Sequence, residues 1–105
     1  MPMTSIAGRT LDVDADGYLT NPDQWDREVA AALAADVGIP ALTDQHWKVI
    51  EFCRKDAKEK GEAPGLRRIA AASGVGMKDL YALFPKGPGK LAAYVSGLPK
   101  PKGCV

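Results

Sequence analysis

Apolar residues recur every three or four positions along most of the chain, which is the period of helices packed on a core. The first such stripe contains Trp25, Val29 and Leu33. Asn21 suits the cap of this helix, and Pro22 suits its first helical position. A Gly-Ile-Pro segment follows and ends the helix, because glycine favours a helix end and proline cannot continue it.

The second stripe is longer and is bounded at both ends. Thr43 is a typical N-terminal cap, and Gly61 stops the helix after Lys60. The residues predicted to face the core are Trp47, Ile50, Cys53 and Ala57. A free thiol on such an apolar face behaves as a small hydrophobic side chain. We therefore interpret Cys53 as structural, since it lacks the exposed basic setting of a reactive thiol.

Three shorter helices are predicted next. The first begins near Pro64 and ends at Gly74-Val75-Gly76. The second covers residues 77–84 and ends at Pro85, and the third runs from about Pro88 to Ser96. The first two have the pattern of a helix-turn-helix. Small Ala70 and Ala71 permit close approach of the helices, and Val75 and Leu80 fill the angle between them.

Before the helices, residues 4–20 consist of short extended pieces separated by two turns. A hairpin of this size is marginal alone and must pack on something. We therefore predict a mainly α fold: a small N-terminal β-hairpin, a compact bundle of about five helices that includes the helix-turn-helix, and a flexible C-terminal arm. The predicted domain covers residues 1–97, and the predicted arm covers residues 98–105.

The length of 105 residues suits one domain with one modest core. The chain has no long apolar run and no basic-then-apolar N-terminus, so we expect neither a membrane span nor a signal peptide. This points to the cytoplasm, where thiols stay reduced. Residues 1–45 hold two bases against eight acids, and residues 46–105 hold twelve bases against five acids. The basic half could attract an acidic partner or nucleic acid, or could be balanced by the acidic half.

The C-terminal tail carries the most distinctive chemistry. Leu98, Pro99, Lys100, Pro101, Lys102 and Gly103 lead to the penultimate residue, Cys104. The two prolines exclude a helix and favour an extended arm that reaches roughly 23 Å beyond Gly97. The tail is either a carrier that brings its thiol into another protein's active site, or a frayed terminus that contains a cysteine. The two lysines supply the positive charge that a reactive thiol needs.

The helix-turn-helix segment is similar to the DNA-binding segment of TetR-type repressors. The residues that could contact nucleic acid are Arg67, Arg68, Lys78 and Tyr81. At the start of the second helix only Lys78 and Tyr81 have side-chain donors, which is thin for reading base edges. A helix-turn-helix is also a common packing unit without DNA. The pattern therefore favours packing, with a DNA-binding regulator as the alternative.

The sequence offers little support for a metal site or a bound cofactor. Aspartates at positions 12, 14, 16 and 23 match the spacing of a calcium loop, but the last position carries Asp where that loop uses Glu, and no helix precedes it. We expect an acidic turn and no metal. His46 is the one histidine, has no evident partner in the sequence, and is expected to pack or hydrogen-bond near Trp47. No phosphate loop or cofactor fingerprint is present, so we expect neither a cofactor nor a stand-alone enzyme.

The segment from Leu83 to Lys90 and the tail from Gly97 to Val105 resemble those of the DsrC/TusE family, which comprises the gamma-subunit proteins of dissimilatory sulfite reductase and their sulfur-relay relatives. Further similar positions are Asp16-Gly17-Tyr18-Leu19, Trp25, His46-Trp47, Pro64 and Arg67. The resemblance covers nearly the whole chain, and its terminal stretch is specific. Members that work with sulfite reductase carry a second thiol at the position of Ala93. The chain is therefore similar to the single-cysteine branch.

The resemblance implies a sulfurtransferase-type carrier in a sulfur relay. Cys104 would accept persulfide sulfur from a donor protein and deliver it to an acceptor enzyme complex, with no cofactor beyond the transient persulfide. In one branch of the family the acceptor makes 2-thiouridine in tRNA, and in sulfur-oxidising relatives it is a redox enzyme. A gamma-subunit-like partner of dissimilatory sulfite reductase is an alternative. We expect a monomer that can form a disulfide dimer through Cys104.

Overall fold

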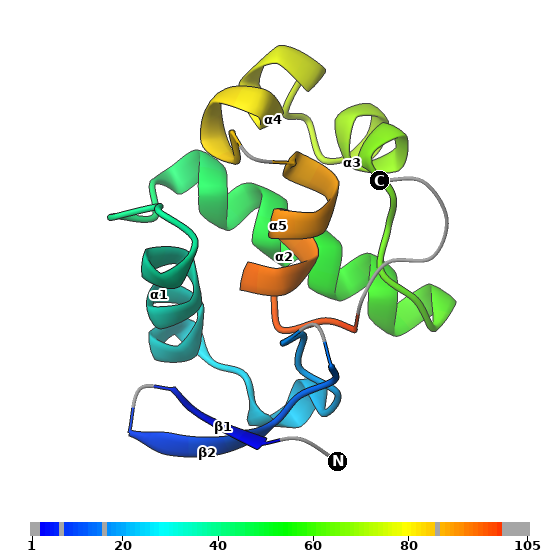
Figure 1. Ribbon diagram of the computed structural model, residues 1–105. Helices are drawn as coiled ribbons and strands as arrows, with labels where there is room; N and C mark the ends of the chain where they lie inside the picture. The colour runs from blue at the N-terminus through cyan, green and yellow to red at the C-terminus, as the bar shows by residue number, and fades with distance from the viewer. Residues whose placement is uncertain (1–2, 7, 16, 86, 100–105) are drawn as a thin grey trace.

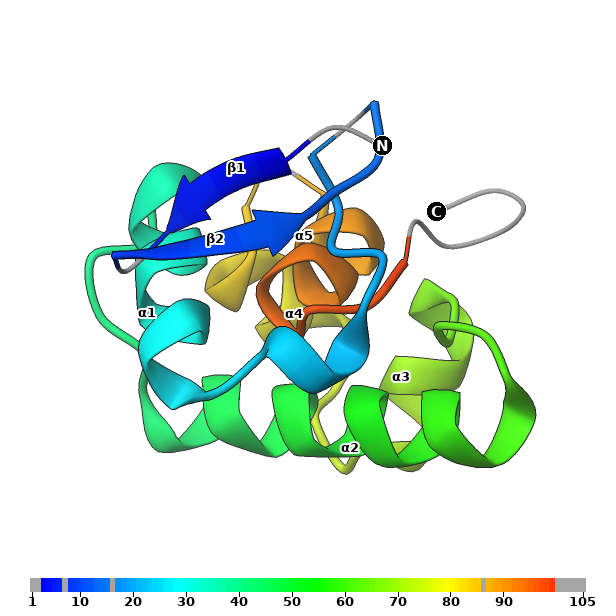
Figure 2. The same cartoon turned by 90° about the horizontal axis from the view of Figure 1, so that it is seen from below.

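The computed structural model describes residues 3–6, 8–15, 17–85 and 87–99 (Figures 1 and 2). The chain begins with an antiparallel hairpin of β1 (Met3–Ile6) and β2 (Arg9–Asp12), in which Met3 lies opposite Asp12. A short 3-10 helix, η1 (Pro22–Gln24), follows the hairpin. Five α-helices complete the described chain: α1 (Arg27–Asp36), α2 (Asp44–Lys60), α3 (Leu66–Ala72), α4 (Met77–Leu83) and α5 (Pro88–Val95). The prediction of a mainly helical fold with an N-terminal hairpin is confirmed.

Helix α5 lies at the centre of the helical part of the molecule. It contacts all four other helices, and both views show it lying over α2 with the remaining helices around it (Figures 1 and 2). Its buried residues include Ala92, Ala93 and Val95, each at most 1 % exposed. Ala93, the position at which relatives were expected to carry an arm thiol, is thus a core residue inside a helix. The chain that leaves α5 therefore starts from a helix that is packed against all four other α-helices.

A second, smaller cluster fixes the hairpin. Leu11, Val13 and Leu19 pack against Val29 and Leu33 of α1, and all five are at most 5 % exposed. The apolar stripe predicted for α1 therefore faces the hairpin. This burial is what a marginal two-stranded hairpin needs in order to persist.

The start of the first helix differs from the prediction. Asn21 caps the short η1 helix, where its side-chain oxygen accepts a hydrogen bond from the Asp23 backbone N–H at 3.1 Å. Helix α1 begins five residues later than expected, and its cap is Asp26, which accepts from the Val29 N–H at 3.0 Å. Both segments carry a good capping residue, so local preference alone does not choose between one long helix and two short ones.

Helix α2 agrees with the prediction at both ends. Thr43 is its N-cap, and Gly61 ends it with a left-handed φ of 80°. His46 Nδ1 accepts from the Thr43 backbone N–H at 3.0 Å, and His46 Nε2 donates to the Leu83 carbonyl at 3.0 Å. This histidine is 6 % exposed and packs edge-on against Phe84. It joins the start of α2 to the end of α4, so its role here is structural.

Among the residues that the structure describes, no helix combines the length and the apolar character that crossing a bilayer would require.

Candidate functional site at the root of the C-terminal tail

Helix α5 ends in a glycine cap. Gly97 has a left-handed φ of 70°, and its N–H donates to the Tyr94 carbonyl at 3.2 Å, while the Leu98 N–H donates to the Ala93 carbonyl at 3.0 Å. These two bonds form a Schellman motif, in which a glycine reverses the chain and the next residue packs back on the helix. Leu98 accordingly lies in the main core cluster and is 3 % exposed.

Two side chains from elsewhere in the chain complete this cap. The Trp25 indole Nε1–H donates to the Val95 carbonyl at 2.9 Å, and the Arg54 guanidinium donates to the Ser96 carbonyl at 2.7 Å. Arg54 also lies over the Trp25 ring, 4.1 Å from its centroid. Carbonyls at the end of a helix have no partner within the helix, so both bonds satisfy groups that would otherwise be desolvated without compensation. We call Trp25, Arg54 and Gly97 the root clamp.

The electrostatics of the clamp follow from its position. Burial lowers the pKa of the Arg54 guanidinium, and the nearby Asp23 carboxylate partly offsets this. Arginine remains protonated through such shifts because its ordinary pKa is so high. The clamp therefore contains a permanent cation that is shielded on one side by the indole ring.

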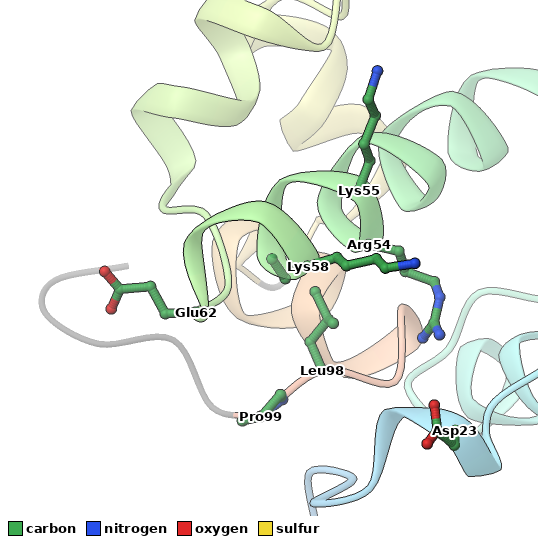
Figure 3. A pocket seen from close by; sticks show the side chains of 9 residues that line it. Asp23, Arg54, Lys55, Lys58, Glu62, Leu98 and Pro99 are labelled. Atoms are coloured by element: carbon green, nitrogen blue, oxygen red, sulfur yellow. The ribbon is translucent and has the colours of Figure 1, made fainter.

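A groove of about 710 Å³ opens where the chain leaves the clamp. Leu98 and Pro99 form part of its wall, and Arg54 and Lys58 of α2 face them (Figure 3). In Figure 3 the Lys58 side chain extends toward Arg54, whereas Lys55 points away from them. Asp23 and Glu62 also line the groove. We call this hollow the α2 groove. The described chain ends in it at Pro99.

Cys53 lies under this region but not in the groove. It is 0 % exposed and belongs to the main core cluster. Burial raises the pKa of its thiol to about 12, although the neighbouring Ser96 hydroxyl lowers it somewhat. Both accessibility and ionisation therefore oppose thiolate chemistry at Cys53. The interpretation of Cys53 as a buried side chain of α2 agrees with the structure.

The predicted arm is only partly within the described chain. Lys100, Pro101, Lys102, Gly103 and the candidate thiol Cys104 lie outside the described residues. Pro99 is exposed, as expected of an arm residue, but Leu98 is buried. Leu98 was assigned to the partner-docking arm, whereas its hydrophobic side chain closes the glycine cap of α5. It belongs structurally to the helical domain.

The residues proposed to contact nucleic acid differ in their environments. Arg67, Lys78 and Tyr81 are exposed on α3 and α4, and Tyr81 is 52 % exposed. Arg68 instead forms a forked pair with Asp56 of α2, with Nη2 2.7 Å from Oδ1. The Arg68 hydrogen bonds lower the pKa of the buried Asp56 carboxyl. Arg68 therefore joins α3 to α2, although its side chain is also exposed.

The acidic turn uses its carboxylates internally. Asp12 Oδ2 accepts from the Gln24 side-chain amide at 3.2 Å, and Asp14 Oδ1 accepts from the Tyr18 N–H at 3.0 Å. Asp16, the third member of the apparent calcium loop, lies outside the described residues. Within the described part of the chain, no three acidic, histidine or cysteine side chains gather closely enough to hold a metal ion.

Comparison with known proteins assigns the chain to a family. Residues 5–105 match the family model described as DsrC like protein. The chain belongs to the DsrC/TusE family. It is 38% identical over 105 residues to the sulfite reductase, dissimilatory-type subunit gamma, of Nitratidesulfovibrio vulgaris, covering 100% of both chains. It is 39% identical over 110 residues to sulfurtransferase TusE of Yersinia pestis, covering 98% of this chain and 100% of the relative.

Solved DsrC structures share the fold. The oxidized gamma-subunit of the dissimilatory sulfite reductase (DsrC) from Archaeoglobus fulgidus superimposes with a TM-score of 0.81 and 38% identity, covering 99% of this chain and 100% of that chain. DsrC from Allochromatium vinosum gives a TM-score of 0.84 and 38% identity, covering 98% and 97%. The resemblance seen in the sequence is thereby confirmed, and with it membership of a family of sulfur-relay carriers.

Sequence reasoning missed the root clamp. Trp25 was placed on the apolar stripe of the first helix and Arg54 was given no role. Their contacts span 70 and 42 residues of chain, respectively, so no local pattern reveals them. The one available signal was Gly97, since a glycine directly after a helix predicts a glycine cap whose exposed carbonyls need partners.

Proposed function

We propose that this DsrC/TusE protein is a sulfur carrier that accepts and delivers persulfide sulfur on Cys104. One observation supports this most strongly. The chain has two cysteines, and Cys53 is fully buried with a thiol pKa of about 12. If a family of sulfur-relay carriers works through a thiol, the burial of Cys53 leaves Cys104 as the candidate in this chain.

The proposed transfer is a thiol–disulfide-type exchange. The Cys104 thiolate attacks the outer sulfur of a donor persulfide, the donor's S–S bond breaks, and the donor cysteine leaves as a thiolate. The new S–S bond on Cys104 holds the transferred sulfur, so no net oxidation occurs and no cofactor is required. In delivery, a thiolate of the acceptor attacks the outer sulfur of the Cys104 persulfide, the S–S bond on Cys104 breaks, and Cys104 leaves as a thiolate.

The tail sequence suits this exchange. Lys100 and Lys102 favour the thiolate, because positive charge stabilises the ionised form. Pro99 and Pro101 restrict the chain and so reduce the entropy lost when it enters a partner's cleft. Gly103 permits a bend next to the thiol. The swinging arm in this proposal therefore begins after Leu98, at the edge of the α2 groove.

The proposed partners are a sulfur-donor protein and an acceptor enzyme complex in the cytoplasm. Because position 93 is a buried alanine, we propose persulfide relay without an internal disulfide. Relatives include both a dissimilatory sulfite reductase gamma subunit and TusE sulfurtransferases. A single arm thiol favours the TusE-like role, with a gamma-subunit-like role as the alternative. Oxidation should give intermolecular dimers through Cys104.

The test is sulfur loading of two matched variants, Cys104→Ser and Cys53→Ser, incubated with a persulfide donor and examined by intact mass. We expect Cys104→Ser to lose loading and keep its fold. We expect Cys53→Ser to keep loading and lose about 1–3 kcal/mol of stability, since its buried hydroxyl must find a hydrogen bond. Loading that survives Cys104→Ser would contradict the proposal.

A DNA-binding regulator is the competing function. Exposed Arg67, Lys78 and Tyr81 on the helix-turn-helix favour it, whereas Arg68 already pairs with Asp56 of α2. Binding through phosphates would weaken steeply with salt. A salt-dependent shift of duplex DNA at micromolar protein, lost in Lys78→Ala, would favour the regulator.

A further inference from the structure

We propose that Trp25 and Arg54 are positioning residues of the sulfur relay: they fix the root of the tail, so that Cys104 is presented from the α2 groove. The inference rests on the proposed function, because it concerns how that thiol is delivered. It adds two residues and a mechanism that the tail sequence alone does not contain.

The two side chains hold consecutive carbonyls at the end of α5. Trp25 binds the Val95 carbonyl at 2.9 Å, and Arg54 binds the Ser96 carbonyl at 2.7 Å. The guanidinium stacks 4.1 Å from the indole centroid, so each side chain also holds the other in place. A charge-assisted bond and a cation–π contact in a partly desolvated place are both stronger than their exposed counterparts.

Gly97 shows how closely the indole fits the root. A Cβ added at Gly97 would collide with Trp25 Cδ1 and would lie 2.8 Å from Trp25 Cβ. Its φ of 70° is also a conformation that favours glycine. Any side chain at position 97 must therefore displace Trp25, which makes Gly97→Ala a way to disturb the clamp from the opposite side.

In this proposal the clamp matters for delivery because it sets the length of chain between the last anchored residue and Cys104. About five residue steps separate Pro99 from Cys104, a span of at most about 17 Å. Without the clamp the free segment could begin near Val95, about nine steps away. The effective concentration of a tethered group falls with roughly the −3/2 power of tether length, so release should lower the concentration of Cys104 at the groove about 2.4-fold.

The chain contains its own matched control. Arg27 lies over the ring of Trp47, 4.4 Å from its centroid, and so forms a second arginine–tryptophan pair. In the part of the chain that the structure describes, Trp25 and Arg54 hydrogen-bond the end of α5, whereas Arg27 and Trp47 do not. The substitutions Trp25→Phe and Arg54→Met, and the controls Trp47→Phe and Arg27→Met, remove the same atoms in two places. A purely structural effect of losing an arginine–tryptophan pair should appear in both sets.

The experiment places an acceptor thiol in the α2 groove. Glu62 is exposed and lines the same groove as Pro99, so Glu62→Cys provides a fixed partner for Cys104. In a glutathione buffer, the two protein thiols form one disulfide as one glutathione disulfide is reduced to two glutathione molecules. The equilibrium ratio, read by intact mass, gives the effective concentration of Cys104 at position 62.

We expect Trp25→Phe, Arg54→Met and Gly97→Ala each to lower that effective concentration about two- to threefold relative to Glu62→Cys alone. Trp47→Phe and Arg27→Met should leave it unchanged. Equal effective concentrations in all five variants would overturn the positioning role. The same decrease in the Trp25 and Arg54 variants as in the control variants would also overturn it. Circular dichroism at the assay temperature confirms that each variant compared is folded, and Arg54→Lys should restore part of the lost value.

This result is independent of sulfur loading. The disulfide equilibrium needs only the Cys104 thiol, whereas the proposed function needs that thiol to accept a persulfide. Loading from a small-molecule persulfide requires no docking geometry, so it should be the same in Trp25→Phe and in the parent chain. A normal equilibrium with no loading would refute the carrier function, and normal loading with unchanged equilibria would refute the clamp.

Discussion

The burial of Cys53 predicts a large difference in reactivity between the two cysteines of one small protein. The perturbation is brief alkylation of the native chain with N-ethylmaleimide at pH 8. Only the thiolate reacts rapidly. With a pKa of about 12 against an ordinary value of 9.0, the Cys53 thiolate is about 10³-fold rarer at this pH than that of an unshifted thiol.

Accessibility increases the difference. Cys53 has 0 % exposure, so the reagent reaches it only when α2 or α5 moves away or the chain unfolds. Labelling of Cys53 should then follow the opening of the core, while labelling of Cys104 should follow simple thiol chemistry. We expect one label per chain within minutes under native conditions and two labels in denaturant.

The assay is intact mass against time, with the labelled position mapped by chymotryptic cleavage after Tyr94. A single native label on the peptide 95–105 is the expected result. Comparable native rates at Cys53 and Cys104 would refute the reasoning, because they would show that neither burial nor the raised pKa protects the core thiol.

Three further predictions follow from the described contacts. Gly97→Ala should lower the free energy of unfolding by about 2–4 kcal/mol, because a side chain is strained at this φ and collides with Trp25; an unchanged urea midpoint would contradict this. Asp56, whose pKa is held below 3.8 by Arg68, stabilises the fold above about pH 4 and loses this contribution as the pH falls through its folded pKa. Urea unfolding between pH 4 and pH 2 should therefore show a steeper loss in the parent than in Asp56→Asn. Calorimetry with Ca²⁺ should show no micromolar binding; binding that Asp14→Ala abolishes would reverse that prediction.

Local sequence patterns correctly predicted the parts of the fold that depend on interactions between neighbouring residues. The Thr43 cap, the Gly61 stop and the buried face that contains Cys53 all depend on residues within a few positions of each other. The predicted start of the first helix was wrong because Asn21 and Asp26 are both good N-terminal caps. Trp25 lies between these two caps, and its indole donates to a carbonyl 70 residues away, a contact that no local pattern contains.

In the candidate site, too, the sequence predicted the features that depend on neighbouring residues and missed those that depend on packing. The tail composition singled out Cys104 as a thiol without a core, and the family resemblance gave it a role. The same reasoning placed Leu98 on the arm, because a residue between glycine and proline reads as extended chain. Its burial comes from the glycine cap, which turns the backbone so that the next side chain packs on the helix just ended.

The central claim, that Cys104 is the carrier thiol, is tested most directly by following one labelled sulfur. The unmodified protein would be incubated with a donor whose persulfide carries sulfur-34, and then with an acceptor thiol in excess. The account predicts one added heavy sulfur on the peptide 95–105, none on the peptide that contains Cys53, and its loss to the acceptor. Heavy sulfur on Cys53, or heavy sulfur on Cys104 that the acceptor cannot remove, would contradict it.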